Sequence, residues 1–268
     1  MKNKQFAVSV IITTYNRPDA LKMVLKSLLK QSVQPAEIII ADDGSGTETQ
    51  TLIETQKALF AIPLLHCWQE DNGFRAAAIR NKSIATSKSD YIIIIDGDVL
   101  LHRHFVRDHL HIAKKGQFVQ GRRVLLSEAL TLQIFSQQKI TLTPFSKGIK
   151  NRLNACSFRL LSPVVSSLLS EQKYTTIRSC NMAFWKKDVM AINGFNEAFT
   201  GWGREDSEFA VRMFNNGIKR KDLRLGGVVY HLHHPQNSRD RLEANELTLS
   251  KTIENQSKFC ELGINQYL

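Results

Sequence analysis

Short apolar runs alternate with amphipathic segments along the first half of the chain. The runs, rich in Ile, Val and Leu, are residues 6–13, 37–41, 63–68 and 91–95. Between them apolar residues recur at helical spacing, which predicts helices that begin near 17–19, 47 and 76. Apolar strands separated by helices are typical of a mostly parallel sheet covered on both faces, so the sequence predicts an α/β fold.

The second half of the chain carries a weaker pattern. Basic residues stand among apolar ones over about 125–173, where no motif is evident, and we expect an inserted helical or mobile region. A strand-like pattern of residues resumes near 174–185. A helix over 205–215 and a strand near 227–231 are also predicted. We therefore expect one domain over 1–235, containing the basic insert, and a C-terminal helical extension over 236–268.

Polar motifs follow three of the predicted strands. In a parallel sheet, ligands bind beyond the carboxyl ends of the strands. Asp96-Gly97-Asp98 places two carboxylates around a glycine that permits a turn, and such oxygens suit Mg²⁺ or Mn²⁺. Asp42, in Asp42-Asp43-Gly44-Ser45, can accept hydrogen bonds from a base or ribose, or can cap a helix instead. The expected edge of the sheet is therefore rich in acidic groups.

The segment from Gly201 to Asp206 is the most specific pattern in the chain. Its two glycines flank Trp202, whose aromatic face suits the apolar side of a sugar ring. Glu205 and Asp206 then begin a helix, where the helix dipole favours the charged carboxylate. Asp206 is our candidate to accept a proton from an attacking hydroxyl, and the alternative is a simple capping cluster.

Histidines end the last predicted strand. Strand alternation would put His231 and His233 on one face and His234 on the other. An imidazole beside carboxylate ligands shifts the preference of a divalent cation from Mg²⁺ toward Mn²⁺. A second group, His102, His104, His109 and His111, is expected to lie on a solvated basic face of a helix.

Charge and cysteine content add limited information. The 268 residues carry a net charge of +11, which suits nucleic acid, anionic lipid or phosphorylated substrates. The basic residues are dispersed and accompany no nucleic-acid signature, so we expect no nucleic acid partner. Four distant cysteines read as free thiols of a cytoplasmic protein. No apolar stretch is long enough to span a membrane, and Met1 to Ala20, with Lys2 and Lys4, reads as a first strand rather than a signal peptide.

Taken together, the motifs resemble the family 2 glycosyltransferases of the GT-A fold. The resemblance runs from about Val8 to Pro235 and is closest to bacterial chondroitin-polymerase-like transferases. Gly201-Trp202-Gly203-Arg204-Glu205-Asp206 also resembles the Gly-Trp-Gly-x-Glu-Asp signature of β-1,4-galactosyltransferases. The resemblance implies an inverting, metal-dependent transfer of a UDP-linked hexose or N-acetylhexosamine to a saccharide or lipid-linked acceptor. It also implies a role in bacterial surface polysaccharide or lipopolysaccharide synthesis.

The same resemblance assigns roles to individual residues. Asp98 and His231 become metal ligands, with His233 as an alternative to His231, and Asp206 becomes the general base. Glu205 is expected to bind a sugar or acceptor hydroxyl beside Trp202 and Gly203. The residues placed around the nucleotide are Thr13, Tyr15, Arg17, Asp42, Arg80, Asp96 and Gly97.

Two other enzyme classes fit less well. A sugar-1-phosphate nucleotidyltransferase would be expected to carry a glycine-rich loop after the first strand, and residues 13–18 contain no glycine. A dehydrogenase lacks its GxGxxG for the same reason. A non-enzymatic basic binder of nucleic acid or membrane stays open, although it leaves the acidic strand ends unexplained. We expect a cytoplasmic enzyme whose insert contacts the anionic inner membrane.

Overall fold

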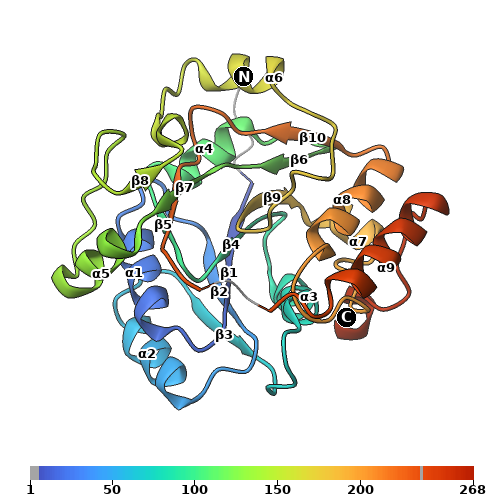
Figure 1. Ribbon diagram of the computed structural model, residues 1–268, viewed down its shortest axis with the longest axis horizontal. Coiled ribbons are helices and arrows are strands. Elements are labelled where there is room, and N and C mark those ends of the chain that lie inside the picture. Colours follow the sequence, from blue (N-terminus) through green and yellow to red (C-terminus); the bar gives the residue numbers. More distant parts are fainter. Residues whose placement is uncertain (1–5, 236–237) are drawn as a thin grey trace.

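A seven-stranded sheet runs through the molecule, which the computed structural model describes at residues 6–235 and 238–268 (Figure 1). The strand order is β10-β6-β9-β4-β1-β2-β3, and only β9 runs antiparallel to its neighbours. The strands are β1 (Val8–Thr14), β2 (Glu37–Asp42), β3 (Leu64–Trp68), β4 (Tyr91–Asp96), β6 (Gln117–Gln120), β9 (Asn181–Trp185) and β10 (Lys219–Asp222). The predicted mostly parallel α/β sheet is therefore confirmed.

Alternate side chains of the central strands enter two separate hydrophobic cores. Ile93 and Ile95 pack with α1 (Pro18–Leu29), α2 (Thr47–Lys57) and α4 (Phe105–Ile112). On the opposite face, Ile92 and Ile94 pack with α3 (Ala76–Thr86), α7 (Lys186–Ala191) and α8 (Glu205–Asn215). Because both faces of the sheet are covered, its central strands β1, β2 and β4 are largely apolar, which is the pattern that made them recognisable in the sequence.

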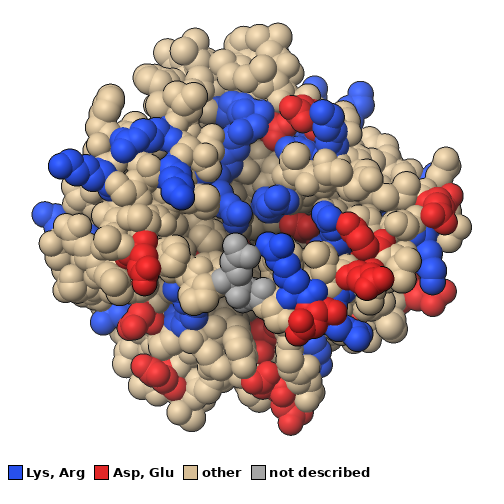
Figure 2. All heavy atoms as spheres, viewed as in Figure 1, with Lys and Arg blue, Asp and Glu red and all other residues tan. Residues whose placement is uncertain are grey.

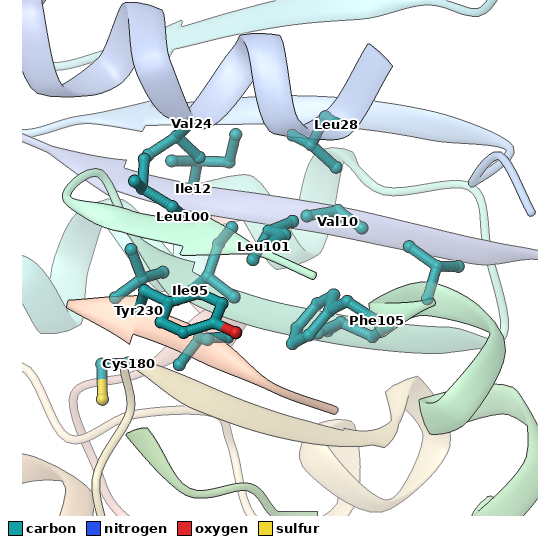
Figure 3. Close-up of a cluster of buried hydrophobic side chains, with 14 of the residues drawn as sticks. Val10, Ile12, Val24, Leu28, Ile95, Leu100, Leu101, Phe105, Cys180 and Tyr230 are labelled. Atoms are coloured by element: carbon teal, nitrogen blue, oxygen red, sulfur yellow. The ribbon is translucent and has the colours of Figure 1, made fainter. Parts of the chain in front are cut away.

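A second, four-stranded sheet covers part of the first core and was not predicted. Its order is β5-β11-β7-β8. The strands are β5 (Val99–Leu101), β7 (Arg123–Leu126), β8 (Ile149–Lys150) and β11 (Val229–His231). Tyr230 and Leu100 point from it toward Ile12 and Ile95 of the large sheet (Figure 3). Through β11, this small sheet places the histidines of residues 231–234 at the edge where β4 ends.

The region predicted as a basic insert contains short elements. They are α5 (Glu128–Gln137), strand β8, the 3-10 turn η1 (Arg152–Ala155) and α6 (Ser162–Leu168). Its limits, and those of the C-terminal extension, stay predictions. The expected boundary after Pro235 adjoins 236–237, which lie outside the described residues, as do Lys2 and Lys4. Among the described residues, no helix is long and apolar enough to cross a membrane.

The last part of the chain packs against helices on both sides of the site. α9 (Leu242–Glu254) lies along α8, and the 3-10 turn η2 (Ile264–Tyr267) lies against α3. The Asn81 amide donates to the Phe195 carbonyl at 2.7 Å, and Ile264 N–H donates to the Asn193 carbonyl at 3.0 Å. The C-terminal residues thereby hold α3 in place.

Two expectations about single residue types have different outcomes. All four cysteines are free, as predicted. The expectation of a solvated histidine face is wrong for His109, which is fully buried and bonds Asn181 Oδ1 at 2.9 Å through Nε2. Burial lowers the pKa of His109 to about 4. α4 packs this residue into the core because its buried face includes positions 105, 106, 108, 109 and 112.

Candidate active site

Three parallel strands end side by side and set the floor of the site. Thr13 of β1 is in register with Asp96 of β4, and Thr14 is in register with Asp42 of β2. Gly97 follows β4 and donates its N–H to the Thr13 carbonyl at 2.7 Å. A Cβ at Gly97 would come within 2.9 Å of Thr14 Oγ1, so glycine is required here for a close approach between two strands.

Asp98, His231 and His234 form a cluster that can hold a cation. One ligand atom from each lies within 4.8 Å of the others. Asp98 Oδ1 is 3.6 Å from His231 Nε2, and Asp98 Oδ2 is 3.4 Å from His234 Nε2. Leu232 N–H donates to the Asp98 carbonyl at 2.9 Å, which fixes β11 beside the strand end. The structure therefore brings His231 and His234 to Asp98, the second aspartate of Asp96-Gly97-Asp98.

The polar atoms of this cluster fit a divalent cation. His231 Nδ1 and His234 Nδ1 each lie within hydrogen-bond distance of a backbone carbonyl, of Leu232 and Pro235 respectively. A carbonyl oxygen can only accept a hydrogen bond, so each Nδ1 carries the hydrogen and donates it, and each Nε2 presents a lone pair toward Asp98. Asp98 Oδ1 is buried and makes no hydrogen bond within the described part of the chain. Two imidazole lone pairs and a carboxylate oxygen are the ligands of a transition-metal-type site.

The face predicted for the terminal histidines is wrong. Alternation would have paired His231 with His233 and turned His234 away, but β11 ends at His231 and the backbone no longer alternates beyond it. His233 is exposed, and its N–H donates to Thr131 Oγ1 at 2.9 Å. The structure therefore favours His234 over His233 as the companion of His231.

Arg80 joins the first aspartate of the motif to the α8 carboxylates. It is buried, and its Nη1 lies 3.1 Å from Glu205 Oε1, while Nη2 lies 3.7 Å from Asp96 Oδ1. Its Nε also donates to Thr13 Oγ1 at 3.3 Å. Burial raises the pKa of Asp96 to about 6, against the lowering effect of Arg80. The guanidinium predicted to reach the nucleotide is thus already engaged by protein groups.

Glu205 and Asp206 form the first turn of α8 at the same edge. Glu205 is buried against Arg80, while Asp206 is half-buried and accepts the Ser179 N–H at 3.3 Å. Burial, and then the neighbouring Glu205, raise the pKa of Asp206 to about 7, although Arg80 and Arg178 oppose the shift. The helix dipole was expected to keep this carboxylate charged, but desolvation dominates. A carboxyl that titrates near neutrality is suited to general base catalysis.

The glycine-flanked tryptophan forms a turn just before α8. Gly201 and Gly203 have φ of +72° and +110°, values that L side chains rarely adopt. Gly201 N–H donates to the Phe74 carbonyl at 3.0 Å, which ties the turn to the segment before α3. Trp202 is 40% exposed, and the Arg239 guanidinium lies 5.4 Å from its ring centroid. The indole is accessible, as a wall for a sugar ring would have to be.

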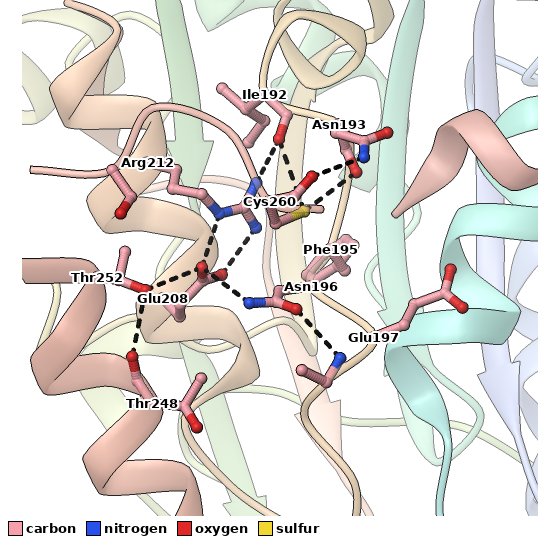
Figure 4. Close-up of polar contacts among 12 residues, drawn as sticks. Ile192, Asn193, Phe195, Asn196, Glu197, Glu208, Arg212, Thr248, Thr252 and Cys260 are labelled. Carbon is pink, nitrogen blue, oxygen red and sulfur yellow. Dashed lines mark hydrogen bonds and ion pairs between the residues drawn. The ribbon is translucent and has the colours of Figure 1, made fainter. Parts of the chain in front are cut away.

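A buried polar network fixes the orientation of α8 one turn below the site (Figure 4). Glu208 and Arg212 form an ion pair at 2.7 Å, with both side chains almost fully buried. Glu208 Oε1 also accepts from Thr252 Oγ1 of α9 at 3.3 Å. Arg212 Nη1 donates to the Ile192 carbonyl. Because α8 is anchored on two sides, Glu205 and Asp206 start from a rigid position.

The other residues predicted to surround the nucleotide already contact protein groups. Asp42 is fully buried, and its two carboxylate oxygens accept from Ser45 N–H and pair with His66 Nε2. A base contact would have to replace one of these bonds, so its role stays a prediction. Tyr15 is exposed and donates to Asp71 Oδ2 at 2.8 Å. Arg17 Nη1 lies 3.1 Å from Asp98 Oδ2, so this arginine contacts the candidate metal-binding cluster directly.

Sequence reasoning missed two arginines near the carboxylates. Arg123 of β7 lowers the pKa of Asp96 by its charge, and Arg178 does the same for Asp206. Arg123 Nη1 makes a weak contact with Cys180 Sγ at 3.8 Å. Neither arginine belongs to a motif with recognisable spacing, so no pattern in the sequence singled them out. Around the centre of the face shown in Figure 2, basic side chains gather while acidic ones lie mostly toward the periphery.

Comparison with known proteins decides the family. The family model described as glycosyl transferase family 2 matches residues 9–164, more than half of the chain. The chain belongs to this family. A second model, described as the N-terminal domain of galactosyltransferase, matches residues 161–235, which include the glycine-flanked tryptophan and the histidines. The resemblance inferred from the motifs is thus confirmed.

Curated relatives include two polysaccharide synthases. The chain is 28% identical over 264 residues to a hyaluronan synthase from Pasteurella multocida. It is 26% identical over 258 residues to a chondroitin synthase from Escherichia coli. These alignments cover 92% and 90% of this family 2 chain, but only 27% and 37% of the relatives. The chain therefore spans about a quarter to a third of the length of these relatives.

Solved structures show the same fold. TarS 1-349 from S. aureus, in complex with UDP-GlcNAc, superposes with a TM-score of 0.63 at 15% identity, covering 97% of this chain and 69% of that one. The mannosyltransferase PcManGT from Pyrobaculum calidifontis, in complex with GDP-Man and Mn²⁺, superposes with a TM-score of 0.62 at 16% identity. That match covers 94% of this chain and 65% of the other. The family 2 chain thus adopts the GT-A glycosyltransferase fold.

Proposed function

We propose that this family 2 protein transfers a sugar from a nucleoside diphosphate carrier to an acceptor hydroxyl, with inversion at the anomeric carbon. One observation carries the proposal: the Asp98–His231–His234 cluster and the Glu205–Asp206 pair lie at the same sheet edge, linked through Asp96 and Arg80. A cation site beside a carboxyl that titrates near neutrality provides for both the leaving group and the nucleophile.

Asp206 is the proposed general base. Its carboxylate takes the proton of the acceptor hydroxyl while the hydroxyl oxygen bonds to the anomeric carbon. The bond from that carbon to the diphosphate oxygen breaks in the same step, and its electron pair leaves with the nucleoside diphosphate. Glu205, held by Arg80 at 3.1 Å, orients a sugar or acceptor hydroxyl, and Trp202 provides an apolar wall for the ring.

The residues that would hold a divalent cation are Asp98, His231 and His234. When bound, such a cation supplies positive charge beside the departing diphosphate. Two imidazole nitrogens favour Mn²⁺ over Mg²⁺, since Mg²⁺ prefers an all-oxygen shell. Asp96 is assigned to the donor ribose or to the cation. Arg123, whose charge lowers the pKa values of both Asp96 and His231, is a further candidate to stabilise the diphosphate.

We assign the donor to the UDP-linked hexoses or N-acetylhexosamines and the acceptor to saccharides or lipid-linked saccharides of a bacterial surface polysaccharide. The named activities of the polysaccharide synthase relatives and the UDP-GlcNAc complex of TarS support this assignment. The residues proposed around the nucleotide are Thr13, Tyr15, Arg17 and Asp42, with Gly97 shaping the strand end. We place the reaction at the cytoplasmic face of an anionic inner membrane, in keeping with the net charge of +11.

The test is turnover of a panel of nucleotide sugars, read as released nucleoside diphosphate, with Mn²⁺, with Mg²⁺ and with a chelator. Release from a UDP-sugar that requires the cation, and is faster with Mn²⁺, is the expected result. Full activity after removal of the cation, or no binding of UDP under any condition, would contradict the proposal. Asp98→Ala should abolish the reaction in a protein whose circular dichroism is unchanged.

A further inference from the structure

Large apolar side chains stand in solvent around η1 and α6. Leu160 is 89% exposed, Leu153 is 84% exposed and Leu168 is 77% exposed, values found for few leucines in a folded domain. The set, which we name the apolar cap, consists of Leu153, Phe158, Leu160, Leu161, Val164 and Leu168. Exposed apolar groups gathered in one short segment mark a surface that contacts another phase or molecule.

The orientation of α6 is the reverse of an ordinary surface helix. Its buried residues are Ser162 and Ser166, while leucine and valine side chains of the same helix are exposed. Ser162 Oγ donates to the Arg224 carbonyl at 2.7 Å, and Arg224 N–H donates to Ser166 Oγ at 2.9 Å. The serines thus anchor the helix through its polar face. The apolar side chains of α6 face solvent because the serines bind its polar face to the domain.

The chain segment that carries the apolar cap contains charged residues of one sign only. Residues 129–170 contain no Asp or Glu, and the basic residues among them are Lys139, Lys147, Lys150, Arg152 and Arg159. In Figure 2 the surface at the top of the view, over α6, is formed by uncharged residues, and both basic and acidic side chains lie below it. An apolar segment whose own charged residues are all cations, although the exposed Glu171 follows it, is complementary to an interface that is apolar inside and anionic at its surface.

We propose that the apolar cap inserts into the headgroup region of an anionic lipid bilayer, with the flanking lysines and arginines paired to the lipid phosphates. The inference rests on the membrane-side acceptor of the proposed function and specifies which atoms make the contact. Electrostatic attraction alone would disappear in high salt, whereas burial of leucine and phenylalanine side chains persists. The two contributions together give a stable but reversible attachment.

The position of the apolar cap relative to the active site suits a lipid-linked acceptor. A groove beside it is lined by Leu153, Val165 and Leu169 and by two arginines, Arg122 and Arg224. Arg122 directly precedes Arg123, whose charge lowers the pKa values of Asp96 and His231. A lipid phosphate held at Arg122 and Arg224 would therefore lie beside the start of β7, the strand that carries Arg123.

The test is sedimentation of the purified protein with vesicles of phosphatidylcholine alone and of phosphatidylcholine mixed with phosphatidylglycerol. We expect binding to the anionic vesicles that weakens in about 1 M salt but stays measurable, since charges are screened within about 3 Å there. The double variant Leu160→Ser with Leu168→Ser should lower the partition coefficient roughly ten-fold or more. Leu59→Ser with Leu247→Ser, which removes two leucines exposed elsewhere, should leave it unchanged.

Each other outcome overturns the inference. Absence of binding to anionic vesicles, equal loss in both double variants, or binding abolished completely by salt would show that the apolar cap does not insert. A wild-type dimer that dissociates when Leu160 and Leu168 are changed would identify the apolar cap as a subunit interface instead. UDP affinity, measured in parallel, should be the same in all variants. A wild-type protein that binds vesicles but not UDP would refute the proposed function and leave the membrane result standing.

Discussion

Arg80 Nη1 lies 3.1 Å from Glu205 Oε1, so the third helix directly holds the first residue of α8. The same guanidinium is 3.7 Å from Asp96. Glu205 is therefore a fixed acceptor within the site, whereas the Asp206 carboxylate accepts longer hydrogen bonds, from the Ser179 N–H at 3.3 Å and from the Ser207 hydroxyl at 3.5 Å. This difference supports the proposed roles, positioning for Glu205 and proton transfer for Asp206.

The two carboxylates should separate in steady-state kinetics. Asp206→Asn should lower kcat by about 10²–10⁴-fold, the usual contribution of a general base, with little change in UDP affinity. Glu205→Gln should have more of its effect in the KM of the acceptor. An Asp206→Asn enzyme within a few-fold of the wild-type kcat would leave this aspartate as a helix cap only.

The pH dependence of kcat should report the raised pKa of Asp206. The base must be deprotonated, and burial raises its pKa to about 7, so kcat should rise with pH through about 7 and level off above it. Arg178 lowers this pKa, and Arg178→Gln should move the rising limb to higher pH. Lys187→Gln, an exposed charge on α7, is the matched control. A limb that stays in place in Arg178→Gln would argue against Asp206 as its origin.

His231, His233 and His234 should differ in their effect on cation binding. His231→Ala and His234→Ala each remove one Nε2 that faces Asp98, and each should weaken Mn²⁺ binding at least about ten-fold. His233→Ala removes an exposed ring outside the cluster and should leave the affinity unchanged. Titration of Mn²⁺ by electron paramagnetic resonance measures all three. Equal affinities for the His234→Ala protein and the wild type would exclude His234 as a ligand.

The sequence predicted the large sheet well for a physical reason. β4 is a run of five buried apolar residues ending in a carboxylate, and such a run has few other stable arrangements in an α/β domain. The second sheet consists of strands of two to four residues, which are too short to show a period. Its pairing depends on contacts between segments far apart in the chain, and these leave no local signal.

The site was predicted at the level of motifs but not of all its atoms. Asp98 and His231 could be proposed as metal ligands because each adjoins a strand end in a motif with a known resemblance, and the structure brings the two side chains together. His234 could not, because the chain leaves the strand before it and a period of two no longer applies. The sequence also did not show that Arg80 pairs with Glu205 or that Asp42 pairs with His66, because these partners are distant in the sequence and meet only in the folded chain.

The ion pair that anchors α8 should be required for stability. Arg212→Met leaves the buried Glu208 carboxylate without its partner and should lower the free energy of unfolding by about 3–5 kcal/mol. The double change with Glu208→Leu should cost less than the sum of the single changes. Lys57→Met, which breaks an exposed pair with Glu54, should cost about 1 kcal/mol or less. Urea unfolding measures each; a small loss in Arg212→Met would show that α8 is held by apolar packing alone.

His109 should make the fold less stable in mild acid. Its folded pKa of about 4 lies below the ordinary value, so the unfolded chain binds a proton first as the pH falls through about 6.5. This residue should therefore remove roughly 2 kcal/mol of stability between about pH 7 and pH 5, at about 1.4 kcal/mol for each pKa unit. His109→Gln should lose this part of the pH dependence. An identical slope in the variant would assign the acid sensitivity to other groups.

The contact between η2 and α3 has a consequence for how the protein is made. Asn81 follows Arg80 directly, and it is held by the Phe195 carbonyl, in a loop that is itself closed by Ile264. A nascent chain on the ribosome therefore lacks the last supports of its arginine until residues near 264 have emerged. The site is therefore complete only once residues near 264 have been synthesised and have packed against α3, and a chain cut before them should lack these supports of Arg80.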